Sequence, residues 1–116
     1  MSDCIFCKII AGEIPAPRVY EDENMIVIKD ISPQAPVHLL VIPKEHYANI
    51  SEMTDAQAAT LAVILKKLGE ISDTLGLSGG FRMISNKGTD ACQTINHLHI
   101  HLLGGEKLSE NMNAVS

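Results

Sequence analysis

Aromatic residues are scarce in this sequence: it contains two Phe, two Tyr and no Trp, so they make up only 3% of the chain. The core of the folded protein must therefore be built mainly from Ile, Leu, Val and Met. Long apolar runs are also missing, because no stretch approaches the roughly 20 residues that a membrane-spanning helix needs. We therefore expect no association with a membrane.

Positive charge is scarce as well. The 9 Lys and Arg residues are outnumbered by 14 Asp and Glu residues, which gives a net charge of −5 and leaves no basic run. A nucleic-acid-binding surface normally needs clustered basic side chains, so the composition argues against nucleic acid as a partner. It leaves open a small nucleotide as ligand.

Cysteine is limited to Cys4, Cys7 and Cys92. The first ten residues include an acid and no long apolar stretch, so no signal peptide is predicted and we expect a cytoplasmic protein. Thiols stay reduced in that compartment, where a C-x-x-C pair indicates metal binding or redox chemistry before a structural disulfide. At this length, and with no internal repeat, residues 1–116 are expected to form a single domain.

The spacing of apolar residues predicts an α+β fold with a five-stranded antiparallel sheet. Strands are predicted at residues 18–22, 25–30, 37–43, 80–87 and 95–103. A short N-terminal helix is predicted at 4–11. One long amphipathic helix follows the capping box of Thr54 and Gln57 and ends near Gly76. Residues 106–116 are predicted to form a loose or partner-contacting tail.

Three histidines stand at alternate positions near the end of the chain, in the run NHLHIHLL: His97, His99 and His101. Alternate residues of a strand point to the same face. The three imidazoles are therefore predicted to line one face of the last strand, while the Leu and Ile residues between them point into the core. Imidazole can bind metals, act as a nucleophile and transfer protons near neutral pH, so the row indicates a functional site.

The loop before this strand supports that interpretation. It contains Gly88, Asp90, Gln93 and Thr94, which supply turn geometry, donors and close approach of the backbone. Loop N–H groups beside a nucleophilic histidine would suit a phosphate group, and Asn86 adds an amide donor. The alternative, a solvent-facing strand on which histidine is merely tolerated, is less favoured.

The sequence allows two different metal sites. The alternating histidines, joined by His38 or His46, could hold a catalytic zinc ion with an open position. The pair of Cys4 and Cys7 could instead form half of a tetrahedral site that two histidines complete, because no second C-x-x-C is present. A redox role for the pair is less favoured, since no strand precedes it. Two incidental thiols are the remaining alternative.

Asp30 and Cys92 are weaker candidates. Asp30 lies at a strand end before a proline-rich loop, where Asp is usually a turn residue bonded to its own backbone. Its carboxylate could alternatively accept hydrogen bonds from ribose hydroxyls. Cys92 could form a nucleophilic pair with a histidine, but a small loop residue is the simpler interpretation.

Three segments together resemble the histidine triad (HIT) family, and specifically its Hint branch: CIFCKIIAGEIPAPRVYEDE (4–23), DISPQAPVHLLVIPKEH (30–46) and HLHIHLLGG (97–105). The match extends over nearly the whole chain, to about residue 108. The resemblance implies a dimeric HIT-like fold and binding of a purine nucleoside monophosphate or its conjugates. It also implies hydrolysis of a nucleoside 5′-phosphoramidate through a covalent nucleotidyl-histidine intermediate.

The resemblance further implies roles for single residues. His99 matches the nucleophile, His101 the histidine that contacts phosphate, and His38 the histidine that extends the relay behind them. Asp30 matches the ribose-binding carboxylate. The phosphate-side positions correspond to Asn86, Cys92, Gln93 and Thr94. The apolar slot for the base corresponds to Ile5, Phe6, Ile9, Ile28 and Ile31.

Zinc is also implied, because many bacterial-type members with the N-terminal Cys pair bind it. The matching ligands are Cys4, Cys7, His46 and His97. A structural zinc would fix the N-terminal helix to the sheet and leave the other two triad histidines for chemistry, so no catalytic metal is expected. The family usually has Gly where Cys92 stands, and a Cβ there could crowd the phosphate-side loop.

Three other functions stay open at this point. The protein could be a nucleotide-binding regulatory or scaffold protein with vestigial activity. It could be a dinucleoside polyphosphate hydrolase, although the resemblance to the Hint branch favours the phosphoramidate. It could also be a metal-dependent hydrolase that uses the triad as zinc ligands.

Overall fold

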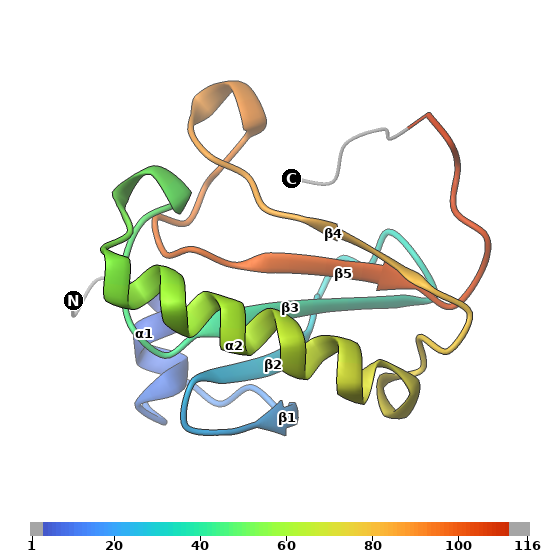
Figure 1. The fold of residues 1–116 in the computed structure, drawn as a ribbon, viewed down its shortest axis with the longest axis horizontal. Helices are drawn as coiled ribbons and strands as arrows, with labels where there is room; N and C mark the ends of the chain where they lie inside the picture. Colours follow the sequence, from blue (N-terminus) through green and yellow to red (C-terminus); the bar gives the residue numbers. More distant parts are fainter. Residues whose placement is uncertain (1–3, 112–116) are drawn as a thin grey trace.

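Residues 4–111, the part of the chain that the computed structural model describes, are organised around one five-stranded antiparallel sheet (Figure 1). The strands pair in the order β1-β2-β3-β5-β4. Their bounds are Arg18–Glu21 for β1, Met25–Lys29 for β2, Val37–Pro43 for β3, Phe81–Ile84 for β4 and Ile100–Gly104 for β5. The predicted α+β fold class, with one long and one short helix, is confirmed.

The long helix α2, Asp55–Ile71, lies across one face of the sheet (Figure 1). It begins where the sequence predicts, because the Thr54 hydroxyl accepts the Gln57 backbone N–H and the Gln57 side chain accepts the Thr54 N–H. Ile64 and Leu68 are each 1% exposed and join a core of sheet residues on this face. Burial of this apolar stripe is what holds the helix in place.

The end of α2 differs from the predicted end. The α-helix stops at Ile71, and Ser72–Leu75 form a 3₁₀ turn before Gly76, which has a φ of +84°. The predicted glycine cap is therefore present, but it closes the tighter last turn that commonly ends an α-helix.

The sheet is buried on both faces. Along β2, Met25 and Val27 point into the core under α2, while Ile26 and Ile28 point into a second apolar cluster on the opposite face. All four side chains are at most 6% exposed. This two-sided burial explains why the strand has a continuous apolar sequence rather than an alternating one.

The short helix α1, Ile5–Ile10, covers the second face of the sheet. Its buried residues Phe6 and Ile9 pack against the β2 and β3 side chains of that face. Gly12 follows the helix with a φ of +82°, the left-handed conformation expected of a glycine just past a helix end.

Two predicted strands are shorter than expected. The strand predicted at 80–87 covers only Phe81–Ile84, and the strand predicted at 95–103 begins at Ile100. The backbone before Ile100 leaves the sheet: the N–H of Leu98 donates to the Tyr47 carbonyl over 2.7 Å instead of to a neighbouring strand. Only one of the three histidines is therefore part of the strand.

The alternation of side chains nevertheless continues through this irregular segment. Leu98, Ile100 and Leu102 are all buried in the core under α2. His97 and His99 contact the Phe6 ring of α1 on the opposite side. The predicted division between histidine face and core face is thus correct even where the strand is absent.

The rest of the chain adds little regular structure. Residues 106–111 form no helix or strand, and the Ser109 carbonyl accepts a 2.9 Å hydrogen bond from Arg82. The predicted tail beyond residue 111 lies outside the described residues. Within residues 4–111, no helix has the length and apolar character needed to cross a membrane.

Candidate functional site

A cavity of about 730 Å³ opens between α1 and the face of the sheet that α1 covers. Apolar side chains form most of its wall: Ile5, Phe6, Ile9, Pro15, Ala16, Pro17, Val19, Ile28, Ile31, Leu40 and Ile95. Its polar and charged lining residues are Lys29, Asp30, Thr94, His99 and His101. Apolar walls with a few convergent polar groups are typical of a site for a small organic ligand.

Most of the residues assigned to a nucleotide from the sequence lie around this cavity. They are Ile5, Phe6, Ile9, Ile28, Asp30, Ile31, Thr94, His99 and His101. Ile31 is 98% exposed at the edge of the cavity. Asn86, Cys92 and Gln93 are not among the lining residues, and His38 lies behind His101.

The hydrogen bonds of His99 define its tautomer. Its Nδ1 lies 2.8 Å from the main-chain carbonyl oxygen of His97, which can only accept, so Nδ1 carries the proton. The lone pair is then on Nε2. His99 also lines the cavity, which gives this nitrogen the form that a nucleophile needs.

A chain of hydrogen bonds defines the tautomer of His101 as well. The Gln34 N–H donates to Nδ1 of His38 over 3.0 Å, so His38 carries its proton on Nε2 and donates to Nδ1 of His101 over 2.9 Å. The remaining proton of His101 is on Nε2. This nitrogen is buried and has no hydrogen-bond partner among the described residues.

Both relay histidines are neutral at pH 7. Burial lowers the pKa of His38. Burial, followed by the proximity of His99 and His38, lowers the pKa of His101 to about 4. His101 therefore presents a neutral N–H donor at the cavity, and an unpaired buried donor is stabilised when a ligand oxygen accepts from it.

Asp30 has the predicted turn role, and its carboxylate also lines the cavity. One carboxylate oxygen accepts the Ser32 N–H over 2.7 Å, which is the local turn expected from the sequence. The other oxygen lies 3.4 Å from Nε2 of His38 and 3.9 Å from Nδ1 of His101. The carboxylate also lines the cavity, within reach of a bound ligand.

A second cluster brings together Cys4, Cys7, His46 and His97. Nδ1 of His97 lies 3.4 Å from Sγ of Cys4, 3.6 Å from Sγ of Cys7 and 3.1 Å from Nδ1 of His46. Sγ of Cys7 lies 3.2 Å from Nδ1 of His46. Tetrahedral zinc with these donors would place neighbouring ligand atoms roughly 3.3–3.8 Å apart.

The donor set of this cluster fits zinc chemically as well. Nε2 of His97 donates to the Pro43 carbonyl over 2.8 Å, which leaves the Nδ1 lone pair facing the cluster. Such a bond from the second ring nitrogen is the usual support of a metal-bound histidine. Burial, followed by the Cys4 side chain, raises the pKa of the Cys7 thiol to about 11. A cation is therefore what would bring these two sulfurs together as thiolates.

The three triad histidines do not converge on one metal. The His97 side chain belongs to the cysteine cluster, whereas Nδ1 of His99 is occupied by a carbonyl group. Asp30, His38 and His101 also lie within reach of a common ion. However, the Nε2 proton of His38 already fills the space between the two imidazoles. The geometry thus argues against a catalytic zinc held by the triad.

The loop before His97 is braced by the Gln93 side chain. Its amide donates to the Ala48 and Ile95 carbonyls over 2.8 and 3.1 Å, and its oxygen accepts the Gly88 N–H over 2.9 Å. Cys92 has a φ of +60° and is the one residue other than glycine with a positive φ among residues 4–111. The Gln93 side chain therefore stabilises the loop without lining the cavity.

Sequence reasoning missed several residues of the site. Pro15, Pro17, Leu40 and Ile95 line the cavity, but they come from three separate segments and carry no chemical signature of their own. The Ser85 hydroxyl donates to the His99 carbonyl over 3.0 Å, and its position just after β4 could have suggested this contact.

Residues 11–108 match the HIT domain family. Protein HitA of Neisseria gonorrhoeae is 45% identical over 104 residues, which cover 90% of this chain and 97% of that protein. A HIT family hydrolase from Clostridium thermocellum superposes with a TM-score of 0.89 and 47% identity, covering 97% of this chain and 98% of the other.

A zinc-bound histidine triad family protein from Mycobacterium smegmatis superposes with a TM-score of 0.76 and 35% identity, covering 94% of this chain and 81% of the other. The family match covers Asp30, His38, His46 and the three triad histidines, and begins after Cys4 and Cys7. The chain belongs to the HIT family.

Proposed function

We propose that this protein is a purine nucleotide-binding hydrolase that cleaves nucleoside 5′-phosphoramidates through a covalent intermediate on His99. The observation that carries the proposal is the pairing of two nitrogens at one cavity: a lone pair on His99 Nε2 and an unpartnered N–H on His101 Nε2. One suits attack on phosphorus, and the other suits a phosphoryl oxygen.

The proposed reaction has two displacement steps. Nε2 of His99 attacks the α-phosphorus, the P–N bond breaks, and the amine takes up a proton from solvent water and leaves. Water then attacks the nucleotidyl-histidine and returns a proton to solvent, which releases the nucleoside monophosphate and the neutral imidazole. Splitting a difficult displacement into two easier ones is the advantage of covalent catalysis.

Two contacts stabilise the charges that develop. The imidazole of His99 becomes positive on attack, and its Nδ1–H donates more strongly to the His97 carbonyl. The Nε2–H of His101 donates to a nonbridging phosphoryl oxygen, held there by the relay from Gln34 through His38.

The remaining cavity residues fit a purine nucleoside. Asp30 would accept ribose hydroxyls, and Thr94 with the backbone beside it would face the phosphate. The base would lie in the apolar slot of Ile5, Phe6, Ile9, Ile28 and Ile31. Hydrolysis as the reaction class is supported by the similarity to the protein named a HIT family hydrolase.

Zinc is proposed as a structural metal held by Cys4, Cys7, His46 and His97. The zinc ion would link α1 to the sheet, and no step of the proposed reaction requires it. The similarity to a zinc-bound relative supports this assignment. A cytoplasmic location is proposed with it, because a reducing compartment keeps the two thiols available.

A homodimer is proposed because β4 is an edge strand whose outward apolar side chains are exposed. Phe81 and Met83 are 37% and 43% exposed, and an unprotected edge strand pairs readily with another chain. Light scattering on the purified protein tests this proposal, and a mass of one chain at micromolar concentration would contradict it.

The test of the proposed activity is hydrolysis of an AMP-amine or AMP-lysine conjugate by the wild type and by His99→Ala and His99→Asn. We expect a loss of roughly 10³-fold or more in kcat for both variants, because the nucleophile is removed. Equal rates would refute the proposal. Binding of AMP without turnover of any phosphoramidate would instead indicate a regulatory nucleotide-binding protein. Preferential cleavage of dinucleoside polyphosphates would indicate a dinucleoside polyphosphate hydrolase.

A further inference from the structure

One wall of the cavity is made by α1, and this helix is too short to be stable by itself. It contains six residues, of which Ile5, Phe6 and Ile9 line the cavity. Isolated helices of this length are not populated in water. The position of the wall therefore depends on how the rest of the protein holds the helix.

The N-terminal end of α1 is held by the cysteine cluster. Cys4 is the residue that caps the helix, and its sulfur accepts the Cys7 N–H over 3.4 Å. Both sulfurs face His46, which follows β3, and His97, which precedes β5. A metal ion bound there would connect the first turn of the helix to two segments at the end of the sheet.

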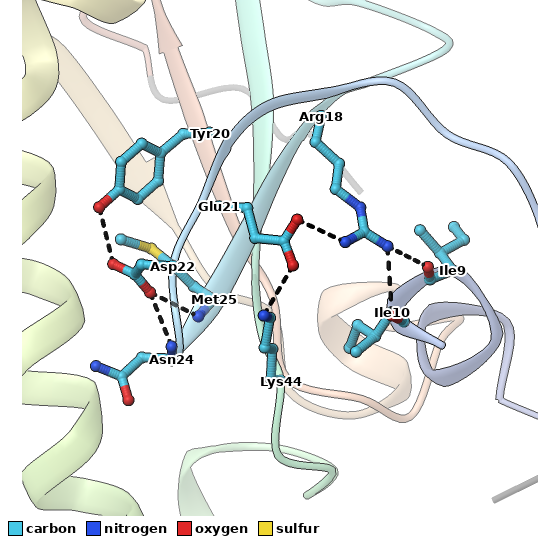
Figure 2. A network of polar contacts seen from close by, with 9 residues as sticks. All are labelled: Ile9, Ile10, Arg18, Tyr20, Glu21, Asp22, Asn24, Met25 and Lys44. Atoms are coloured by element: carbon cyan, nitrogen blue, oxygen red, sulfur yellow. Dashed lines mark hydrogen bonds and ion pairs between the residues drawn. The ribbon is translucent and has the colours of Figure 1, made fainter. Parts of the chain in front are cut away.

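The C-terminal end of α1 is held in a different way, by Arg18 of β1. Its guanidinium donates to the Ile9 and Ile10 carbonyls over 2.6 and 3.3 Å, and it is itself fixed by Glu21 at 2.7 Å (Figure 2). Glu21 in turn contacts Lys44 over 2.8 Å. These bonds satisfy carbonyl groups that a helix end leaves without partners, and they need no metal.

The first turn of α1 also contacts the proposed nucleophile. The Phe6 ring meets the His97 and His99 rings edge-on, with ring centres 5.8 and 5.1 Å apart. His97 supplies one ligand to the cysteine cluster and, through its carbonyl, holds His99. A displacement of this turn would therefore alter the wall of the cavity next to the reactive nitrogen.

We propose that metal occupancy of the Cys4/Cys7/His46/His97 cluster and nucleotide affinity are coupled through α1, with Arg18 as a positioning residue at the other end of the helix. The inference rests on the proposed nucleotide site and adds that metal occupancy regulates the affinity of this site. Without metal, the first turn samples undocked positions and Arg18 keeps the last turn in place, so nucleotide affinity is reduced but not abolished. Both ligands favour the docked helix.

Such coupling must be reciprocal. If zinc raises the affinity for AMP by a certain factor, AMP must raise the affinity for zinc by the same factor. A cluster that only stabilises the fold would show neither effect under conditions where the protein stays folded: zinc would leave the affinity for AMP unchanged, and AMP would leave the affinity for zinc unchanged.

The first experiment measures AMP binding by calorimetry in the zinc-loaded protein and in the protein stripped by a chelator. We expect the Kd for AMP to rise about 10-fold on stripping, within the usual range of coupling between two sites. A chromogenic chelator competed against the zinc-loaded protein, with and without saturating AMP, should report the same factor for zinc. Hydrogen exchange should show loss of protection in α1 while β3 and β5 remain protected.

The second experiment leaves the metal in place. Arg18→Met should weaken AMP binding severalfold with zinc stoichiometry unchanged, because it frees only the last turn of α1. Lys66→Met is the matched control: it removes a cation from the exposed Lys66–Glu70 pair of α2, on the other side of the sheet, and should leave the Kd unchanged. If the stripped protein unfolds, these two variants still test whether the position of α1 determines the affinity for AMP.

Several outcomes would overturn the inference. Equal AMP affinity with and without zinc in folded protein would exclude the coupling, as would AMP affinity that is the same in Arg18→Met and wild type. Zinc-loaded protein that binds no AMP at all would refute the proposed nucleotide site and the coupling together. Zinc-loaded protein that binds AMP without any influence on zinc affinity refutes the coupling alone.

Discussion

At the scale of single residues, Cys92 is held in a backbone conformation that favours glycine. Its φ and ψ are +60° and +35°, a left-handed conformation that costs a residue with a Cβ on the order of 1 kcal/mol. The sequence pattern singled out this position because the family usually has Gly there. The structure supplies the physical reason, which is the backbone angle of the loop.

Replacement of Cys92 by Gly should therefore increase the free energy of unfolding by about 0.5–1 kcal/mol, after allowance for the greater freedom of glycine in the unfolded chain. Urea denaturation measures this difference. Cys92→Ala is the control, since it keeps the Cβ and removes only the sulfur. A stabilisation of the same size in both variants would assign the effect to the thiol and not to the backbone.

The neutral His101 makes stability depend on pH in a defined direction. Its pKa is about 4 in the folded protein, whereas an unfolded histidine titrates near 6.5. Between these values the unfolded chain binds a proton that the folded protein does not, so stability falls as the pH decreases from about 6.5 to 4 and is unaffected above this window. Asp30 opposes the trend, while His38 and His99 add to it.

His101→Asn removes this titration. We expect the wild type to be the more stable protein at pH 7.5 and to lose its advantage as the pH approaches 4.5, as measured by the melting temperatures of both proteins. The comparison cancels the carboxylates that also titrate in this range. A difference in Tm that stays constant across the window would contradict the prediction, because it would mean that His101 binds protons equally in the folded and unfolded protein.

At the scale of elements, β5 is pressed closely against the turn that precedes β4. A Cβ built on Gly104 would lie 2.6 Å from a Leu77 methyl group and 2.8 Å from the Gly80 carbonyl oxygen. The second contact involves backbone and cannot be relieved by rotating a side chain. Gly104 is thus required by packing, whereas Gly105 has a φ of +87° in the turn that follows.

Gly104→Ala should lower the free energy of unfolding by about 1–3 kcal/mol, the usual range for overpacking. Gly69→Ala is the matched control, because Gly69 lies in α2 and its added Cβ would meet nothing within 4 Å. This control should instead raise stability, by up to about 1 kcal/mol. Thermal unfolding of both variants measures the two effects, and a tolerated alanine at 104 would mean that the turn before β4 can move.

The histidine segment shows how far sequence patterns reach at this scale. Alternation predicted correctly that Leu98, Ile100 and Leu102 face the core. It could not predict that the strand starts only at Ile100, because the reason is a hydrogen bond from Leu98 to a carbonyl 51 positions earlier in the sequence, on Tyr47. A local pattern reports which side a residue faces, while strand bounds depend on distant partners.

At the scale of the whole molecule, the same distinction separates the predictable from the unpredictable part of the site. Groups with distinctive chemistry, such as the Cys pair and the histidines, could be identified from their spacing. The cavity could not, because its wall combines proline, leucine and isoleucine residues from several segments. The tautomers of His99 and His101 were equally inaccessible, since main-chain carbonyl and N–H groups determine them.

The sheet divides the molecule into a supporting side and a functional side. None of the buried residues of the core under α2 lines the cavity, whereas the cavity and both clusters lie on the side of α1. Tyr47, a titratable residue buried in the α2-side core, has its pKa raised by burial and takes no part in either cluster.

The pairing of β3 with β5 has a consequence for how the protein is made. The relay histidines His38 and His101 are 63 residues apart in the sequence, and the entire helix α2 is synthesised between them. Long-range strand pairs of this kind close late and slowly. Until the last segment of the chain has been synthesised, the relay between His38 and His101 is absent and the cavity is incomplete. The metal cluster also lacks His97, its fourth ligand. Binding at either proposed site would therefore report that synthesis and folding are complete, because a ligand that binds only the folded protein stabilises it over its precursors.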